Sequence, residues 1–287
     1  MKQHFSTIFA ILVIIFGLGI FFYPNISDWY IQRHQAEIIK DYSKKTKGMS
    51  KKEIKKIKKA AQDYNKSLMN NRSILTDPFD EKAWKALSFN YKKLLNVNGV
   101  MAYIEIPKIK VYLPVYHGTD KKTLEKGIGH LQNTSLPIGG KGTHCVLSGH
   151  SGLPAAMLFT NLDQLKTGDQ FYIHVLDEIL AYKVDQIKVV EPEDISLLSI
   201  QPEEDYVTLV TCTPFGKNTH RLLVRGKRTA YHKDQWKKAK DDANNRSLWD
   251  RLKDLFRHRG VAVQIFGAGI GLIIAMIIVR VIKKKQN

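Results

Sequence analysis

Two long apolar runs lie near the ends of the chain, at residues 5–23 and 260–279, and neither contains a charged residue. A helix needs about 20 apolar residues to cross the hydrocarbon core of a bilayer. We therefore expect a transmembrane helix at each end. No small-residue cleavage site follows the first run, which favours an uncleaved signal anchor over residues 1–23.

Flanking charge predicts the orientation of these helices. Lys2 precedes the first run and a basic tail, residues 280–287, follows the second. Basic flanks favour the cytoplasmic side, so both termini are expected there, with residues 24–259 extracellular and the lipid bilayer as a partner. The expected organisation is an anchor at 1–23, a helical segment at 24–99, a barrel at 100–228, a basic linker at 229–259, a second span at 260–279 and the tail at 280–287.

Helical periodicity dominates the segment that follows the first run. Ile54, Ile57, Ala61, Tyr64 and Leu68 recur at spacings of three and four, which predicts one apolar stripe on a lysine-rich helix over about residues 44–66. A second helix is expected over residues 81–95. Between them lies a helix-breaking turn at residues 76–80, which contains Asp77-Pro78-Phe79.

From Met101 the period changes to two. Short runs rich in Val, Ile, Tyr and Thr are separated by Gly, Pro or Asp, as in a small closed barrel or a sandwich. One helix is expected near residues 155–165. The predicted strands are residues 102–106, 111–116, 144–147, 170–176, 181–190, 206–211 and 221–225.

Composition and charge narrow the class of protein. The chain has 287 residues, and its two cysteines exclude a disulfide-stapled miniprotein and a four-cysteine zinc ribbon. The net charge of +18 suggests nucleic acid, but residues 100–228 are neutral and the excess lies on the flanks. Basic flanks beside apolar runs favour a membrane or an anionic wall polymer over DNA, so no nucleic-acid partner is expected.

Candidate chemistry lies at the ends of the predicted strands. Cys212 ends one strand, Arg221 opens the next, and His150 follows a third strand in a Gly- and Ser-rich turn. Cys145, in contrast, lies within a strand and is expected in the core. A thiol, a base and a cation are what a cysteine acyl transferase needs. Residue types alone leave other readings open: a disulfide, a metal site with His144, Cys145 and His150, or a plain surface arginine.

Several ordered motifs resemble sortases. Residues 208–214 (TLVTCTP) followed by 218–226 (NTHRLLVRG) resemble the active-site region of that family, and residues 147–150 (LSGH) followed by 152–154 and 158–159 resemble its histidine region. Residues 128–130 and 135–140 extend the match over most of 100–228. The resemblance implies a mainly β fold, an eight-stranded barrel with flanking helices, and a membrane-anchored cysteine transpeptidase of Gram-positive bacteria.

The resemblance also assigns roles. It implies Cys212 as nucleophile, His150 as general acid and base, and Arg221 as the cation that holds the oxyanion and positions the substrate. The substrate would be an LPxTG-like sorting signal cut between Thr and Gly, with no cofactor or metal.

Two features, the second apolar run and Asp77-Pro78-Phe79, resemble the pilin-polymerising class C branch and its lid. We expect Asp77 to pair with Arg221 and Phe79 to cover the thiol. Pilin subunits would then be the partners, joined through a lysine isopeptide bond. A wall-anchoring sortase that uses a peptidoglycan amine, and a non-enzymatic pilus assembly scaffold, remain as alternatives.

Overall fold

The computed structural model describes residues 2–70, 77–79, 89–153, 156–245, 247 and 249. The chain divides into two compact units, Asn25–Asn244 and the two terminal segments Met1–Pro24 and Asn245–Asn287. The fold and the sites described below belong to Asn25–Asn244.

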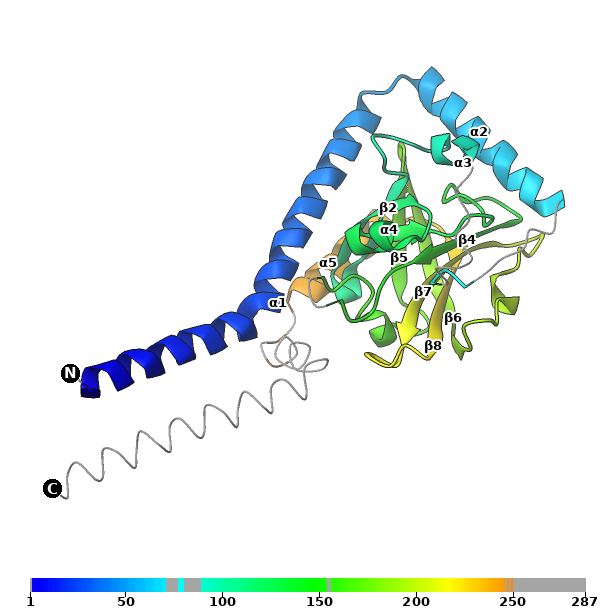
Figure 1. Cartoon of the computed structure of the whole chain (residues 1–287). Helices are drawn as coiled ribbons and strands as arrows, with labels where there is room; N and C mark the ends of the chain where they lie inside the picture. Colours follow the sequence, from blue (N-terminus) through cyan, green and yellow to red (C-terminus); the bar gives the residue numbers. More distant parts are fainter. Residues whose placement is uncertain are drawn as a thin grey trace. The chain divides into compact units, whose positions relative to one another are not determined.

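A closed barrel of eight strands, all within the described residues, forms the centre of this unit (Figure 1). The strand order around the barrel is β1-β2-β3-β4-β7-β8-β6-β5. The pairs β2–β3 and β4–β7 are parallel and the other pairs are antiparallel. The strands are β1 Ala102–Ile106, β2 Val111–His117, β3 Ile128–His130, β4 Thr143–Ser148, β5 Gln170–Val175, β6 Glu178–Val190, β7 Asp205–Thr213 and β8 His220–Thr229.

Side chains that alternate along these strands point into the barrel and fill its interior. The inward positions carry large apolar residues, and the cluster they form includes Ile104, Phe171, Val207 and Leu209, each with no exposed surface. Burial of this kind contributes about 1.5–3 kcal/mol for each large side chain. The prediction of a mainly β, eight-stranded barrel with flanking helices is confirmed.

Helices cover the outside of the barrel. They are α1 Lys2–Lys47, α2 Lys51–Asn70, α3 Phe89–Lys93, α4 Lys121–Lys126 and α5 Lys233–Asn244. The helix predicted over residues 44–66 is in fact divided between α1 and α2, because the chain turns at Gly48 and Ser50 caps α2 by accepting from the N–H of Glu53.

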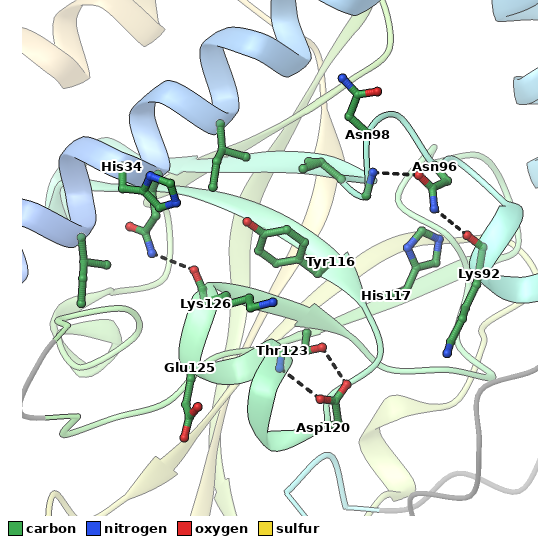
Figure 2. Close-up of a pocket in the computed structure, with 15 residues that line it drawn as sticks. His34, Lys92, Asn96, Asn98, Tyr116, His117, Asp120, Thr123, Glu125 and Lys126 are labelled. Carbon is green, nitrogen blue, oxygen red and sulfur yellow. Dashed lines mark hydrogen bonds between the residues drawn. The ribbon is translucent and has the colours of Figure 1, made fainter.

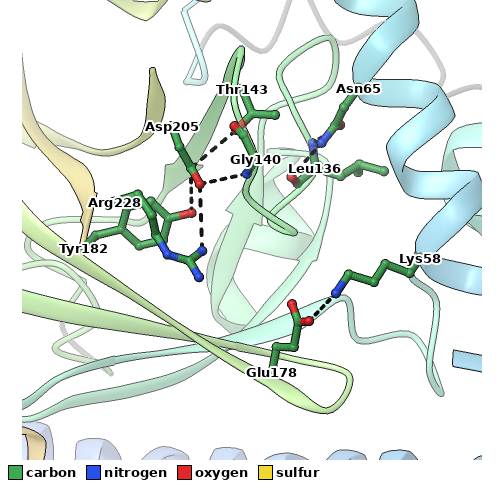
Figure 3. Close-up of polar contacts among 9 residues, drawn as sticks. All are labelled: Lys58, Asn65, Leu136, Gly140, Thr143, Glu178, Tyr182, Asp205 and Arg228. Carbon is green, nitrogen blue, oxygen red and sulfur yellow. Dashed lines mark hydrogen bonds and ion pairs between the residues drawn. The ribbon is translucent and has the colours of Figure 1, made fainter. Parts of the chain in front are cut away.

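Polar contacts, two of them buried and one exposed, link α1 and α2 to the barrel. The Tyr42 hydroxyl of α1 donates to the carbonyl of Met101 at 3.0 Å. Asn65 of α2 pairs with both backbone groups of Leu136, and Lys58 forms an ion pair with Glu178 (Figure 3). These contacts hold the N-terminal helices against the strands.

A second buried hub lies at Asp205, the first residue of β7. Its carboxylate accepts from the Tyr182 hydroxyl at 3.0 Å and from the N–H of Gly140 at 2.7 Å, and it lies beside Arg228 (Figure 3). Gly139 has φ +63, and a Cβ there would lie 2.8 Å from the Asp205 carboxylate. Glycine at this turn therefore lets the 135–140 segment close over the start of β7.

Two secondary-structure predictions need correction. The helix expected near residues 155–165 is, in its described part, a run of turns with one short 3₁₀ helix at Leu162–Gln164. Apolar side chains of this segment pack into the barrel core although the backbone is a loop. Their burial therefore does not require a helix. The strand β3 was not predicted, because three residues are too few to display alternation. Of the helix predicted over 81–95, residues 81–88 lie outside the described residues.

The predicted localisation is contradicted. No helix among the described residues is both long enough and apolar enough to cross a membrane. This finding contradicts the predicted localisation, with two transmembrane helices and both termini cytoplasmic. The first apolar run is part of the 46-residue helix α1, which continues unbroken into charged residues such as Asp28, Arg33 and Glu37. Residues 260–279 and 280–287 lie outside the described residues.

Candidate active site

The ends of three strands bring together the three residues singled out in the sequence. β4 and β7 run parallel, with Ser148 opposite Val210. Continuing this register by two residues puts His150 level with Cys212. In the antiparallel pair β7–β8, Cys212 lies directly opposite Arg221. The prediction that the thiol and the guanidinium are side by side is confirmed.

The turn that carries His150 is held by backbone and side-chain bonds. The Thr211 hydroxyl donates to the carbonyl of Gly149 at 2.7 Å, and the N–H of Phe159 donates to the carbonyl of His150 at 3.1 Å. Gly152 has φ +82, which glycine adopts without strain. Sequence reasoning gave Thr211 no role, although its place beside Cys212 in a buried strand was a usable signal.

A small apolar cluster lies on the outer face of the strands that end at the site. Val210 and Leu223 each stand two residues from Cys212 and Arg221, and therefore share their face of the sheet. We call the five buried residues here the outer cluster: Leu131, Val146, Leu198, Val210 and Leu223. Phe79 packs against it.

The segment Asp77-Pro78-Phe79 lies directly over this site. Both carboxylate oxygens of Asp77 accept from Arg221, from Nε at 2.8 Å and from Nη2 at 2.5 Å. The Phe79 ring centroid lies 5.8 Å from that of His150 and 5.1 Å from the Arg221 Cζ. Phe79 therefore contacts the imidazole and the guanidinium, while Asp77 occupies the fork of Arg221.

Arg221 is fully engaged in this arrangement. Its Nη1 donates to the carbonyls of Asn218 at 3.1 Å and His220 at 3.2 Å. Asn218 has φ +57, a conformation that asparagine tolerates better than most residues. The loop carbonyls thus fix the plane of the guanidinium. A substrate oxygen can reach its Nε and Nη2 only after Asp77 leaves.

Both reactive groups are shifted towards their neutral forms. Burial raises the pKa of the Cys212 thiol, Arg221 lowers it and the Asp77 carboxylate raises it further. Burial lowers the pKa of His150, while Glu125 of α4 raises it and Lys121 lowers it. The closed arrangement therefore favours an uncharged thiol beside an uncharged imidazole.

We expect the Asp77→Asn variant to shift the pH dependence of thiol reactivity. The negative charge of Asp77 raises the Cys212 pKa, so its loss must lower that pKa and increase the thiolate fraction at a given pH. The rate of Cys212 alkylation, measured from pH 6 to 10, should show a midpoint below that of the wild type. An unchanged or higher midpoint would contradict this electrostatic account.

The alternatives drawn from residue types can now be judged by position. Cys145 and Cys212 are both free thiols, and Cys145 is 3% exposed within the barrel core, where burial raises its pKa well above the ordinary value. His144 bonds through both ring nitrogens, to the Ser199 carbonyl at 2.9 Å and the Thr208 hydroxyl at 2.7 Å. Neither residue is part of the site around Cys212.

Known proteins match this chain in sequence and in fold. The sortase domain family matches residues 104–229. Sortase D of Bacillus subtilis is 34% identical over 128 residues, which cover 44% of this chain and 62% of that protein, less than two thirds of its length. Sortase A of Streptococcus agalactiae is 28% identical over 218 residues, which cover 75% of this chain and 81% of that protein.

Solved structures give the same result at a higher sequence identity. Sortase C-1 from Streptococcus pneumoniae is 47% identical, with a TM-score of 0.65, covering 68% of this chain and 100% of that one. A pilus-related sortase C of group B Streptococcus is 47% identical, with a TM-score of 0.63, covering 67% of this chain and 97% of that one. With its closed barrel and these matches, the chain belongs to the sortase family, whose members are cysteine transpeptidases.

Proposed function

We propose that this protein is a class C sortase that joins pilin subunits. It would cleave an LPxTG-like sorting signal between Thr and Gly and transfer the Thr carbonyl to a lysine side chain of the next pilin. The observation that carries the class is the Asp77–Arg221 pair over the site, with Phe79 against His150. The solved structures that resemble the chain support the proposal, since they are sortases C and one is described as pilus-related.

Cys212 is the nucleophile in this proposal. Its Sγ attacks the Thr carbonyl carbon while the thiol proton passes to His150, and the carbonyl oxygen takes up negative charge. Arg221 donates from Nε and Nη2 to that oxygen, in the place that the Asp77 carboxylate occupies at rest. The C–N bond then breaks as His150 gives its proton to the leaving glycine amine, and a thioester remains.

The second half of the reaction reverses these proton transfers. The lysine amine attacks the thioester carbon, His150 accepts a proton from that amine, and the C–S bond breaks as the proton returns to the sulfur. The product is an isopeptide bond. The thioester retains the acyl reactivity of the cleaved peptide bond, so the transfer needs no nucleotide.

The direct experiment is transfer between defined substrates. The full chain, incubated with a sorting peptide, should form a thioacyl adduct on Cys212 that is detectable by mass spectrometry. Adding a pilin with an accessible lysine should give a cross-linked product. Transfer only to a peptidoglycan amine would support a wall-anchoring sortase in place of the pilin-joining one. The absence of any adduct would support the non-enzymatic scaffold.

The lid gives a separate prediction. The side chains of Asp77 and Arg221 are each only 11% exposed, so their pair is less screened than a surface pair worth about 0–1 kcal/mol. Replacing both Asp77 and Phe79 by Ala removes the pair and the ring contact. We expect faster labelling of Cys212 by a thiol reagent and faster hydrolysis of a sorting peptide, since water then reaches the thioester.

A matched control is the Lys59→Ala variant, which removes an exposed ion pair with Asp63 on α2, away from the site. It should leave both rates unchanged. Equal labelling rates in the wild type and the Asp77, Phe79 double variant would exclude the lid and weaken the class C assignment.

A further inference from the structure

A pocket of about 740 Å³ lies between α1 and the side of the barrel (Figure 2). Its wall is formed by one face of α1, the end of β2, the helix α4 and the turn that precedes β1. In Figure 2 the ring of Tyr116 lies across the middle, with His34 on α1 to one side and Glu125 and Lys126 below. None of Cys212, His150 and Arg221 lines this pocket.

Two polar groups at the pocket lack partners among the described residues. Gln35 is 2% exposed, and its Nε2 donates to the carbonyl of Lys126 at 3.0 Å, which fixes the orientation of the amide. Its Oε1 accepts no hydrogen bond. The Tyr116 hydroxyl also has no hydrogen-bond partner there, and burial raises its pKa to about 12. Because Oε1 has almost no accessible surface, the group that a ligand in the pocket can reach is the Tyr116 hydroxyl, which can both donate and accept.

The charges of the lining favour a neutral ligand. Lys92 and Lys126 are balanced by Asp120 and Glu125 when the histidines are neutral. Asp120 is already occupied, because its carboxylate accepts from the N–H and the hydroxyl of Thr123 at 3.1 and 2.7 Å. The pocket therefore has no excess charge that would hold a phosphate, a carboxylate or an ammonium group.

Apolar surface accompanies these polar groups. The Tyr116 ring lies close against the backbone at Gly127, where a Cβ would come within 3.0 Å of the ring, and Ile31 and Ile38 of α1 line the same pocket. A flat ligand with C–H groups on its faces and hydroxyls around its edge fits this combination. An extended peptide fits less well, because β2 is paired on both sides, with β1 and β3, and offers no free edge.

We propose that this pocket binds a neutral sugar ring. The pyranose faces would contact Tyr116 and the isoleucines, while its hydroxyls bond with the Tyr116 hydroxyl. A free oligosaccharide and a wall glycan share this chemistry. The proposal does not depend on transpeptidation, because Cys212, His150 and Arg221 do not line the pocket.

The test is binding of a neutral tetramer of β-1,4-linked N-acetylglucosamine to the full chain, followed by saturation-transfer NMR and titration. A parallel co-sedimentation assay uses purified peptidoglycan stripped of protein and teichoic acid. Binding of the tetramer alone identifies a free saccharide as the source, and binding of both identifies wall glycan. We expect Tyr116→Ala to weaken binding at least about tenfold and Tyr116→Phe, which keeps the ring, to weaken it less.

Tyr112→Ala is the matched control, since Tyr112 is a 40% exposed tyrosine on the same strand that does not line the pocket. It should bind like the wild type, and melting curves should show that each variant is folded. Adduct formation at Cys212 should be unchanged in Tyr116→Phe. No saccharide binding, equal binding by folded wild type and Tyr116→Ala, or binding of a lysine peptide in place of the sugar would overturn the proposal.

Discussion

Replacing Cys212 by Ala is expected to abolish thioacyl formation, whereas replacing Cys145 by Ala should leave most of it. Cys212 stands at the end of β7 opposite Arg221, where the proposed mechanism places the attack on the substrate carbonyl. Loss of a nucleophile from a covalent mechanism costs up to about 10⁶ in rate. Intact-mass spectrometry after incubation with a sorting peptide measures the adduct directly.

Cys145 is the internal control for this experiment. It is a core residue of β4 in the main apolar cluster, and truncating it removes one sulfur atom from the packing. The expected effect is a loss of stability of about 1 kcal/mol, seen as a lower melting temperature, with chemistry retained. Equal loss of the adduct in the two folded variants, or a Cys145–Cys212 disulfide in the active protein, would contradict these assignments.

Most of the barrel could be predicted because its strands alternate. The prediction for residues 102–106 agrees with β1 at both ends, and the other predicted strands differ from the observed ones by a few residues. The first three residues of β6 (178–180) and the last four of β8 (226–229) lie outside the predicted ranges. Gly226 of β8 lies so close to Phe171 that a Cβ would fall 2.5 Å from the ring, and such an approach leaves no periodic signal.

The helices were harder to predict because tertiary contacts decide where they end. One helix was expected over the lysine-rich residues 44–66, yet the chain turns at Gly48 and starts a new helix at Lys51. Near residues 156–165, side chains such as Phe159 and Leu162 fill the core from a loop. The apolar residues of this segment have a composition that would also suit a helix. Only the structure shows that they lie in a loop.

The candidate site was partly visible in the sequence. The placement of Cys212 beside Arg221 followed from a strand end and a loop length. Two features did not follow: the support that Thr211 gives to the His150 turn, and the contact of Phe79 with His150. Both join segments distant in sequence, and no local pattern encodes the distance between them.

The second large effect is expected at Arg221. In the Arg221→Lys variant the charge remains but the planar fork is lost. At rest, Nε and Nη2 hold the two Asp77 oxygens while Nη1 holds the carbonyls of Asn218 and His220. The same fork can fix the guanidinium to the loop and still present two donors to an oxyanion. A lysine ammonium cannot do both, because its donors radiate from one atom.

We therefore expect Arg221→Lys to lower kcat by about 10²–10³, the usual cost of one oxyanion donor, with a smaller change in KM. Adduct formation with a sorting peptide and the melting temperature should be measured together. The variant should also label faster at Cys212, since a lysine holds the Asp77 lid less firmly than a two-bond fork. Slow turnover together with fast labelling of Cys212 would show that Arg221 acts in transition-state binding. A disrupted site would not leave the thiol more reactive. Turnover near that of the wild type at an unchanged melting temperature would show that charge alone suffices, and Arg221 would then be a partner of the lid and not of the oxyanion.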